Sequence, residues 1–85
     1  MSAHPFDLSG QFFHTFDDEG CLEFQGQIIG SPEAGLYLCQ LFSAITGEPT
    51  RQILTRVKEM AGWRFYASAE KWRLAYDAHI LADKR

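Results

Sequence analysis

Basic and aromatic side chains occur together between residues 51 and 66, and this segment is the best candidate for a binding function. Bases beside aromatic rings can follow a nucleic-acid backbone and stack on its bases. The net charge of −3 argues against this interpretation, because nucleic-acid-binding domains are typically strongly basic. Packing of the same side chains between a sheet and a helix is the alternative. The candidate binding residues are Arg51, Gln52, Arg56, Trp63, Arg64 and Tyr66.

The sequence contains no recognisable set of nucleophile, base and orienting group. His14 precedes Asp17 and Asp18 closely, as a general base beside a carboxylate would. However, His14 alternates with Phe12 and Phe16, which is typical of a residue on one face of a strand. We therefore predict no catalytic residue and no glycine-rich phosphate loop.

Metal-binding and disulfide chemistry are also not indicated. The acidic run Asp17-Asp18-Glu19 offers hard oxygen ligands, but a single acidic turn is more typical of a hairpin tip. The three histidines are scattered along the chain. Cys21 and Cys39 are too few for a disulfide framework, and both lie in apolar runs. We predict two buried or half-buried thiols, no metal and no cofactor.

Charge is distributed unevenly along the chain. Residues 1–35 contain six acids and no Lys or Arg, a charge of −6, whereas residues 36–85 contain eight bases and five acids, a charge of +3. Such an asymmetry favours contacts with a second copy or with a partner. A merely solvated surface is the alternative.

The elements that position these residues are mostly strands. Alternating apolar residues predict strands over 11–16, 21–30, 36–44, 51–57 and 63–66, with a helical turn near 58–62. In the second strand, Leu22, Phe24 and Ile28 share the apolar face with Gly26. A glycine at such a position often marks a tight bend.

One helix ends the chain. Ser68 is a predicted N-cap, and the helix extends over about 68–83. Helical spacing places five side chains on one face, which we expect to cover the strands: Trp72, Ala75, Tyr76, His79 and Ile80. Residues 1–10 show no periodicity and are expected to form a flexible N-terminal arm, pinned by Phe6 and Leu8.

Five short strands at about ten-residue spacing indicate a small barrel or sandwich. The predicted fold is mostly β, an SH3-like five-stranded barrel with a C-terminal α-helix, forming one domain over residues 11–85. An α+β fold with an open antiparallel sheet and one helix is the alternative. The sequence contains neither a membrane-spanning run nor a signal peptide, so we expect a cytoplasmic protein.

Several segments are similar to a group of small uncharacterised bacterial proteins associated with mobile elements. The similar segments cover most of the chain and are 13–20, 25–26, 37–42, 47–50 and 60–66. The resemblance carries no assigned activity.

A second resemblance concerns about 40 residues. Phe24-Gln25-Gly26-Gln27-Ile28-Ile29-Gly30 resembles the Trp-Gln-Gly-Gln-Ile-Val-Gly strand of the plasmid-borne, trimethoprim-insensitive dihydrofolate reductase, an SH3-like homotetramer. That enzyme lines its pore with a Val-Gln-Ile-Tyr strand and a lysine. Here Gln52 and Ile53 match the strand, but Leu54 replaces its tyrosine, and Asp18 takes the place of the lysine. The resemblance therefore supports the scaffold more than the activity.

These observations predict a small non-enzymatic binding or adaptor protein whose partner is a protein, a peptide or a second copy of the chain. Two alternatives stay open. One is an oligomeric oxidoreductase that resembles dihydrofolate reductase and uses NADPH. The other is a protein that binds nucleic acid weakly.

Overall fold

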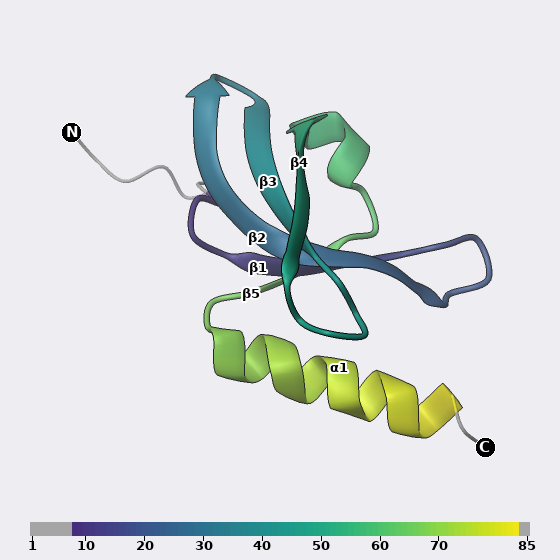
Figure 1. The fold of residues 1–85 in the computed structure, drawn as a ribbon. Helices are drawn as coiled ribbons and strands as arrows, with labels where there is room; N and C mark the ends of the chain where they lie inside the picture. Colours follow the sequence, from purple (N-terminus) through teal and green to yellow (C-terminus); the bar gives the residue numbers. More distant parts are fainter. Residues whose placement is uncertain (1–7, 84–85) are drawn as a thin grey trace.

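The computed structural model describes residues 8–83 and contains five strands, a short 3-10 helix and one α-helix (Figure 1). A mostly-β chain with a C-terminal helix is therefore confirmed. The elements in chain order are β1 (Phe12–Phe16), β2 (Leu22–Glu33), β3 (Leu36–Phe42), β4 (Pro49–Arg56), η1 (Val57–Met60), β5 (Arg64–Tyr66) and α1 (Ala69–Asp83).

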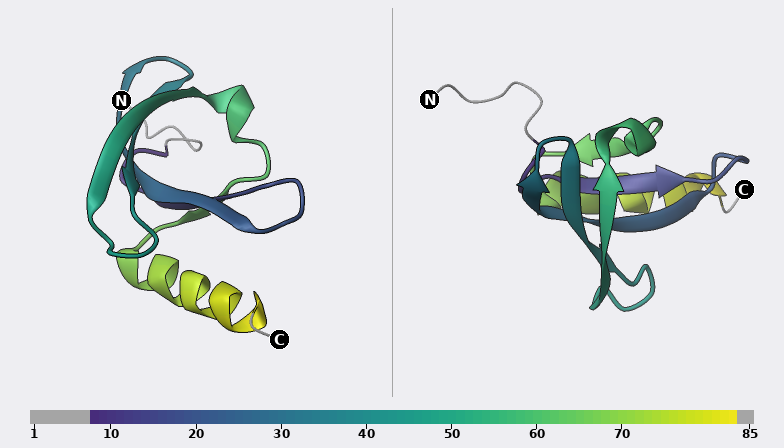
Figure 2. Two further views of the ribbon diagram at one scale, coloured as in Figure 1. Left: turned by 45° about the vertical axis from the view of Figure 1, so that its right-hand side comes forward. Right: turned by 90° about the horizontal axis from the view of Figure 1, so that it is seen from above.

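All five strands belong to one antiparallel sheet in the order β4-β3-β2-β1-β5. The sheet is strongly curved, and η1 connects its two edge strands (Figure 2). Within residues 8–83, β4 and β5 do not pair with each other, so hydrogen bonds do not close the sheet into a barrel.

Close packing at Gly26 accompanies the curvature of β2. Gly26 lies between Phe13 of β1 and Leu41 of β3, and a Cβ atom there would overlap the carbonyl oxygen of Gln40 and the ring of Phe13. A tight bend was predicted at Gly26; the structure shows close packing there, and the register shifts of β2 lie at other residues. The segment 31–33 was expected to be a loop and instead extends β2, with register shifts near Gly30.

The inner, concave face of the sheet carries the hydrophobic core. Its buried members are Phe13, Ile28, Tyr37, Cys39, Leu41 and Met60. Phe24, which was expected to share this apolar face, is 43% exposed. The register of β1 against β2 shifts between His14 and Phe16, and this irregularity interrupts the simple alternation at the start of β2.

Helix α1 lies against the outer face of the sheet, over β1 and β5 (Figures 1 and 2). The Trp72 ring stacks on Phe12 with ring centroids 4.9 Å apart, and the Tyr76 hydroxyl donates to the carbonyl oxygen of Ala44 over 3.1 Å. The predicted cap is present, because Ser68 Oγ accepts the N–H of Lys71 over 3.2 Å. The expectation that the helix covers the strands is confirmed.

Only residues 8–10 of the predicted arm belong to the described part of the chain. Leu8 packs against the core, and the N–H of Gly10 donates to the carbonyl oxygen of Ile28 over 2.8 Å. The prediction for residues 1–7, including Phe6, lies outside the described residues.

Candidate functional site

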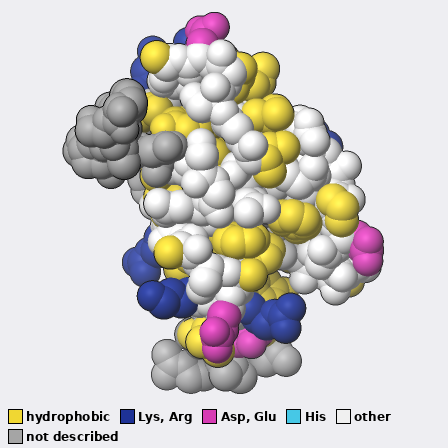
Figure 3. Space-filling view, turned by 90° about the vertical axis from the view of Figure 1, so that its left-hand side faces the viewer, with side chains coloured by type: hydrophobic (Ala, Val, Ile, Leu, Met, Phe, Trp, Pro, Cys, Tyr) yellow, Lys and Arg dark blue, Asp and Glu magenta, His cyan; other side chains and the backbone are white. Residues whose placement is uncertain are grey.

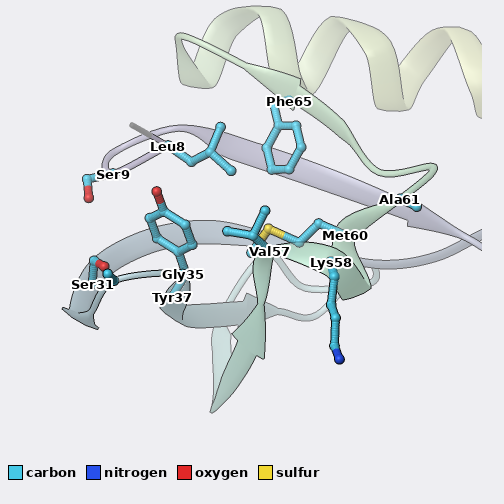
Figure 4. Close-up of a pocket in the computed structure, with 11 residues that line it drawn as sticks. Leu8, Ser9, Ser31, Gly35, Tyr37, Val57, Lys58, Met60, Ala61 and Phe65 are labelled. Atoms are coloured by element: carbon cyan, nitrogen blue, oxygen red, sulfur yellow. The ribbon is translucent and has the colours of Figure 1, made fainter. Parts of the chain in front are cut away.

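A groove of about 900 Å³ opens on the concave side of the sheet. It lies between the end of the β2–β3 hairpin, η1 and β5 (Figure 4). Apolar side chains from distant parts of the chain line it, namely Leu8, Tyr37, Val57, Met60 and Phe65. Its size falls in the range of roughly 300–1,000 Å³ that is common for ligand sites.

Local hydrogen bonds hold the walls of the groove. The N–H of Val57 donates to the carbonyl oxygen of Gly35 over 2.9 Å, which fixes η1 against the hairpin. Gly35 has a φ of 78°, a conformation that glycine adopts without strain. The Glu59 carboxylate accepts the N–H of Arg56 over 3.1 Å and caps η1, whose Met60 is buried. The groove is therefore largely preformed.

The interior of the groove is nearly uncharged. Lys58 belongs to its rim, but its ammonium group points away from Leu8, Tyr37 and Phe65 (Figure 4). The hydroxyl of Ser31 is engaged with the hairpin backbone, at 3.0 Å from the carbonyl oxygen of Glu33 and 2.9 Å from that of Leu36. The groove therefore offers mainly apolar contact area.

The predicted binding residues on β4 and those on β5 lie at opposite edges of the sheet. Arg51, Gln52 and Arg56 are exposed along β4, where the Gln52 side-chain amide donates to Oε1 of Gln40 over 3.1 Å. Arg64 and Tyr66 belong to β5. The strand order thus divides these residues into two separate groups.

Trp63, the remaining predicted binding residue, is half-buried. Its ring stacks on Phe13 with ring centroids 4.7 Å apart, and it packs against the hydrophobic core. Trp63 therefore packs on the concave face of the sheet, opposite α1, and not between the sheet and the helix.

The outer face of β2, β3 and β4 carries a second apolar area. Ile29 is 44% exposed and Leu54 is 59% exposed, and hydrophobic side chains form a band on the side of the molecule shown in Figure 3. Ile53, between Gln52 and Leu54, is half-buried and packs against the core. Consequently Gln52 and Ile53, which match the reductase strand, face opposite sides of the sheet.

Sequence reasoning did not anticipate the contact between His14 and Tyr66. His14 Nδ1 lies 3.2 Å from the Tyr66 hydroxyl, and the imidazole is 1% exposed. Burial lowers the pKa of His14 below its ordinary value of 6.5; the Gln25 side chain opposes this shift and His79 adds to it. Burial likewise raises the pKa of Tyr66, with Arg64 opposing. The sequence contained one signal for this contact. The alternation of His14 with Phe12 and Phe16 places the imidazole on the same strand face as these two rings, and this is the face that the helix covers.

Metal-ligand clusters and membrane-spanning helices are both absent from the described part of the chain. Residues 8–83 contain no group of three or more His, Cys, Asp or Glu side chains placed to hold a metal ion. Within the same residues, no helix combines the length and the apolar character needed to cross a membrane.

Comparison of the chain with known protein families, curated proteins and solved structures found no match.

Proposed function

We propose that this chain is a non-enzymatic, cytoplasmic binding module whose groove takes a neutral, apolar segment of a partner polypeptide. The observation that carries the proposal is the apolar lining of the groove. Tyr37 and Phe65 provide rigid aromatic area, and the flexible thioether of Met60 adapts to different side chains. Apolar anchors of this kind supply most of the binding energy at interfaces.

The charges around the groove favour an uncharged occupant. The side chains of Arg56 and Lys58 on or beside η1 are balanced by Glu33 and Glu59. A strongly charged peptide would gain little from this rim, because its attraction to two of these side chains is offset by its repulsion from the other two. The groove is also open along its length. It therefore suits a polypeptide, which can cover the whole groove, better than a small molecule, which would stay half exposed.

We further propose that the scaffold is SH3-like. In support, β1 to β4 pair in sequence order, β5 returns to pair with β1, and η1 spans the gap between the sheet edges. The fold alone does not determine the partner, since many unrelated functions use SH3-like scaffolds.

The test is an NMR titration of the isotopically labelled chain with an acetylated and amidated Ala-Leu-Met-Phe-Ala peptide. We expect saturable shifts at Tyr37, Met60 and Phe65, loss of these shifts in Val57→Glu, and retention in Leu54→Glu. Val57 and Leu54 are both about half exposed, but only Val57 lines the groove. Equal effects of the two substitutions, or no shifts at millimolar peptide, contradict the proposal.

Two further measurements identify other occupants. Groove shifts that depend on protein concentration without peptide identify a second copy of the chain. Groove shifts caused by Phe6→Ser without peptide identify residues 1–7. Either result overturns the assignment of the groove to a partner polypeptide.

The reductase and nucleic-acid alternatives stay predictions. NADPH oxidation in the presence of dihydrofolate tests the first, and gel retardation at low salt tests the second, because phosphate contacts weaken as salt rises.

A further inference from the structure

A polar crevice of about 530 Å³ lies between the sheet and α1, on the opposite side of β5 from the groove. Phe65 lines the groove, whereas its neighbours Arg64 and Tyr66 line the crevice, as the alternation along a strand requires. His14 of β1 and His79 of α1 complete its polar lining, and Ala75 and Ala78 leave room beside the helix.

Arg64 supplies a positive charge to this crevice. Its side chain is exposed, and its guanidinium lies 5.9 Å from the centroid of the Phe16 ring. Among the side chains that the structure describes, those of residues 8–80, no carboxylate forms an ion pair with it. A guanidinium is weakly hydrated and matches the two oxygens of a carboxylate or phosphate group.

Tyr66 and His14 provide a directed hydrogen-bond donor. When His14 carries its proton on Nδ1, it donates to the Tyr66 oxygen over 3.2 Å, which leaves the hydroxyl proton of Tyr66 available to an acceptor in the crevice. Nε2 of the same imidazole is buried and has no hydrogen-bond partner within the described residues. His79 is positioned by its own Nε2, which accepts the N–H of Leu22 over 3.2 Å.

An acidic turn borders one end of the crevice. Asp17, Asp18 and Glu19 precede Gly20, which lines one end. Oδ1 of Asp17 accepts the N–H groups of Glu19 and Cys21, both over 2.9 Å, so it is engaged within its own turn. Asp18 and Glu19 are exposed to solvent, where salt screens their charge.

We propose that this crevice binds a small oxyanion, a carboxylate or a phosphate group, between Arg64 and the Tyr66 hydroxyl. The guanidinium supplies the charge and a pair of donors, Tyr66 supplies a third donor, and the small helix residues admit the group. The site is separate from the groove, so its proposed role does not depend on the proposed binding of a polypeptide.

The experiment is an NMR titration of the full chain with acetate, with inorganic phosphate and with chloride, at constant ionic strength. We expect saturable shifts of the Arg64 side-chain N–H and of the imidazole C–H signals of His14 and His79. Preference for acetate or for phosphate identifies which oxyanion the site takes. Equal shifts with chloride reveal only a general salt effect and overturn the proposal.

Three variants complete the test. Arg64→Gln should weaken binding at least tenfold, whereas Arg51→Gln, an exposed arginine at the far edge of the sheet, should leave it unchanged. Tyr66→Phe should weaken binding severalfold. Equal losses of affinity in the two arginine variants would show an effect of net charge and would overturn the proposed site. Unchanged affinity in Tyr66→Phe would show that the Tyr66 hydroxyl does not bind the oxyanion. The spectrum of each variant reports whether the fold is intact.

Discussion

Nε1 of Trp72 donates a hydrogen bond of 3.1 Å to the backbone carbonyl oxygen of Phe13. The side chain of Phe13 is fully buried on the other face of the sheet, where it stacks on Trp63. One residue of β1 therefore contributes its side chain to the concave core and its carbonyl oxygen to the attachment of the helix. The helix is thus part of the packed domain, and the crevice beside it depends on this contact.

Substitution of Trp72 should release α1. Trp72→Phe removes the hydrogen bond and should lower the free energy of unfolding by about 0.5–1.5 kcal/mol, and Trp72→Ala should cost about 2–4 kcal/mol because the aromatic contacts are also lost. Urea denaturation followed by circular dichroism measures both. Leu74→Ala, on the exposed face of the same helix, should change stability by less than about 0.5 kcal/mol. A similar loss in Leu74→Ala would contradict the assigned role.

Gly26→Ala should destabilise the domain, because the added Cβ meets the Gln40 carbonyl oxygen and the Phe13 ring. Overpacking of this kind costs about 1–3 kcal/mol. Gly30→Ala is the matched control in the same strand, since a Cβ at Gly30 meets no atom within 4 Å. Thermal unfolding of the two variants should therefore separate them, and equal melting temperatures would refute the explanation.

Much of the fold could be predicted because its signals are local. The alternation along each strand, the capping Ser68 and the helical spacing of Trp72, Tyr76 and His79 all act within a few residues of the chain. In each case the local preference agrees with the final structure. At Gly26 the same local reasoning predicted a tight bend, whereas the structure shows close packing against the Gln40 backbone.

The candidate sites could not be predicted in the same way, because they depend on long-range pairing. His14 and Tyr66 are 52 positions apart and meet only through the pairing of β1 with β5. Arg51 and Arg64 were both assigned to one basic and aromatic binding segment, yet the strand order places them at opposite edges of the sheet. Phe24 was expected to be part of the buried apolar face, yet it is 43% exposed near a change of register that the alternation does not reveal.

Cys39 should resist alkylation in the folded protein. Burial raises the pKa of its thiol above the ordinary value, although Thr55 opposes the shift, and the side chain is fully buried. The thiolate is the reactive form, so both effects slow the reaction. Mass spectrometry after iodoacetamide treatment at pH 8 should show modification of the half-buried Cys21 before Cys39. Modification of Cys39 first, without unfolding, would contradict the packing described.

The stability of the domain should fall as the solution becomes mildly acidic, because of His14. Burial lowers the pKa of this imidazole below 6.5 in the folded state, so the unfolded chain binds more protons between the two pKa values. Stability therefore rises with pH through this window. The stabilisation that His14 contributes is fully present above about pH 6.5 and is lost as the pH falls toward the lower, folded-state pKa. Over this window the free energy of unfolding changes by at most about 1.4 kcal/mol per pH unit for one proton.

Urea denaturation at pH 7.5, 6.5 and 5.5 measures this dependence, and His14→Gln should reduce its slope by removing the titrating group. His79 adds to the shift, and Arg64 lies on the neighbouring strand. His79→Gln should therefore raise the pKa of His14 slightly in an NMR titration of the imidazole signal, and Arg64→Gln should act in the same direction. An imidazole of His14 that titrates at or above 6.5, or an unchanged slope in His14→Gln, would show that the buried ring is not the group that couples protonation to folding.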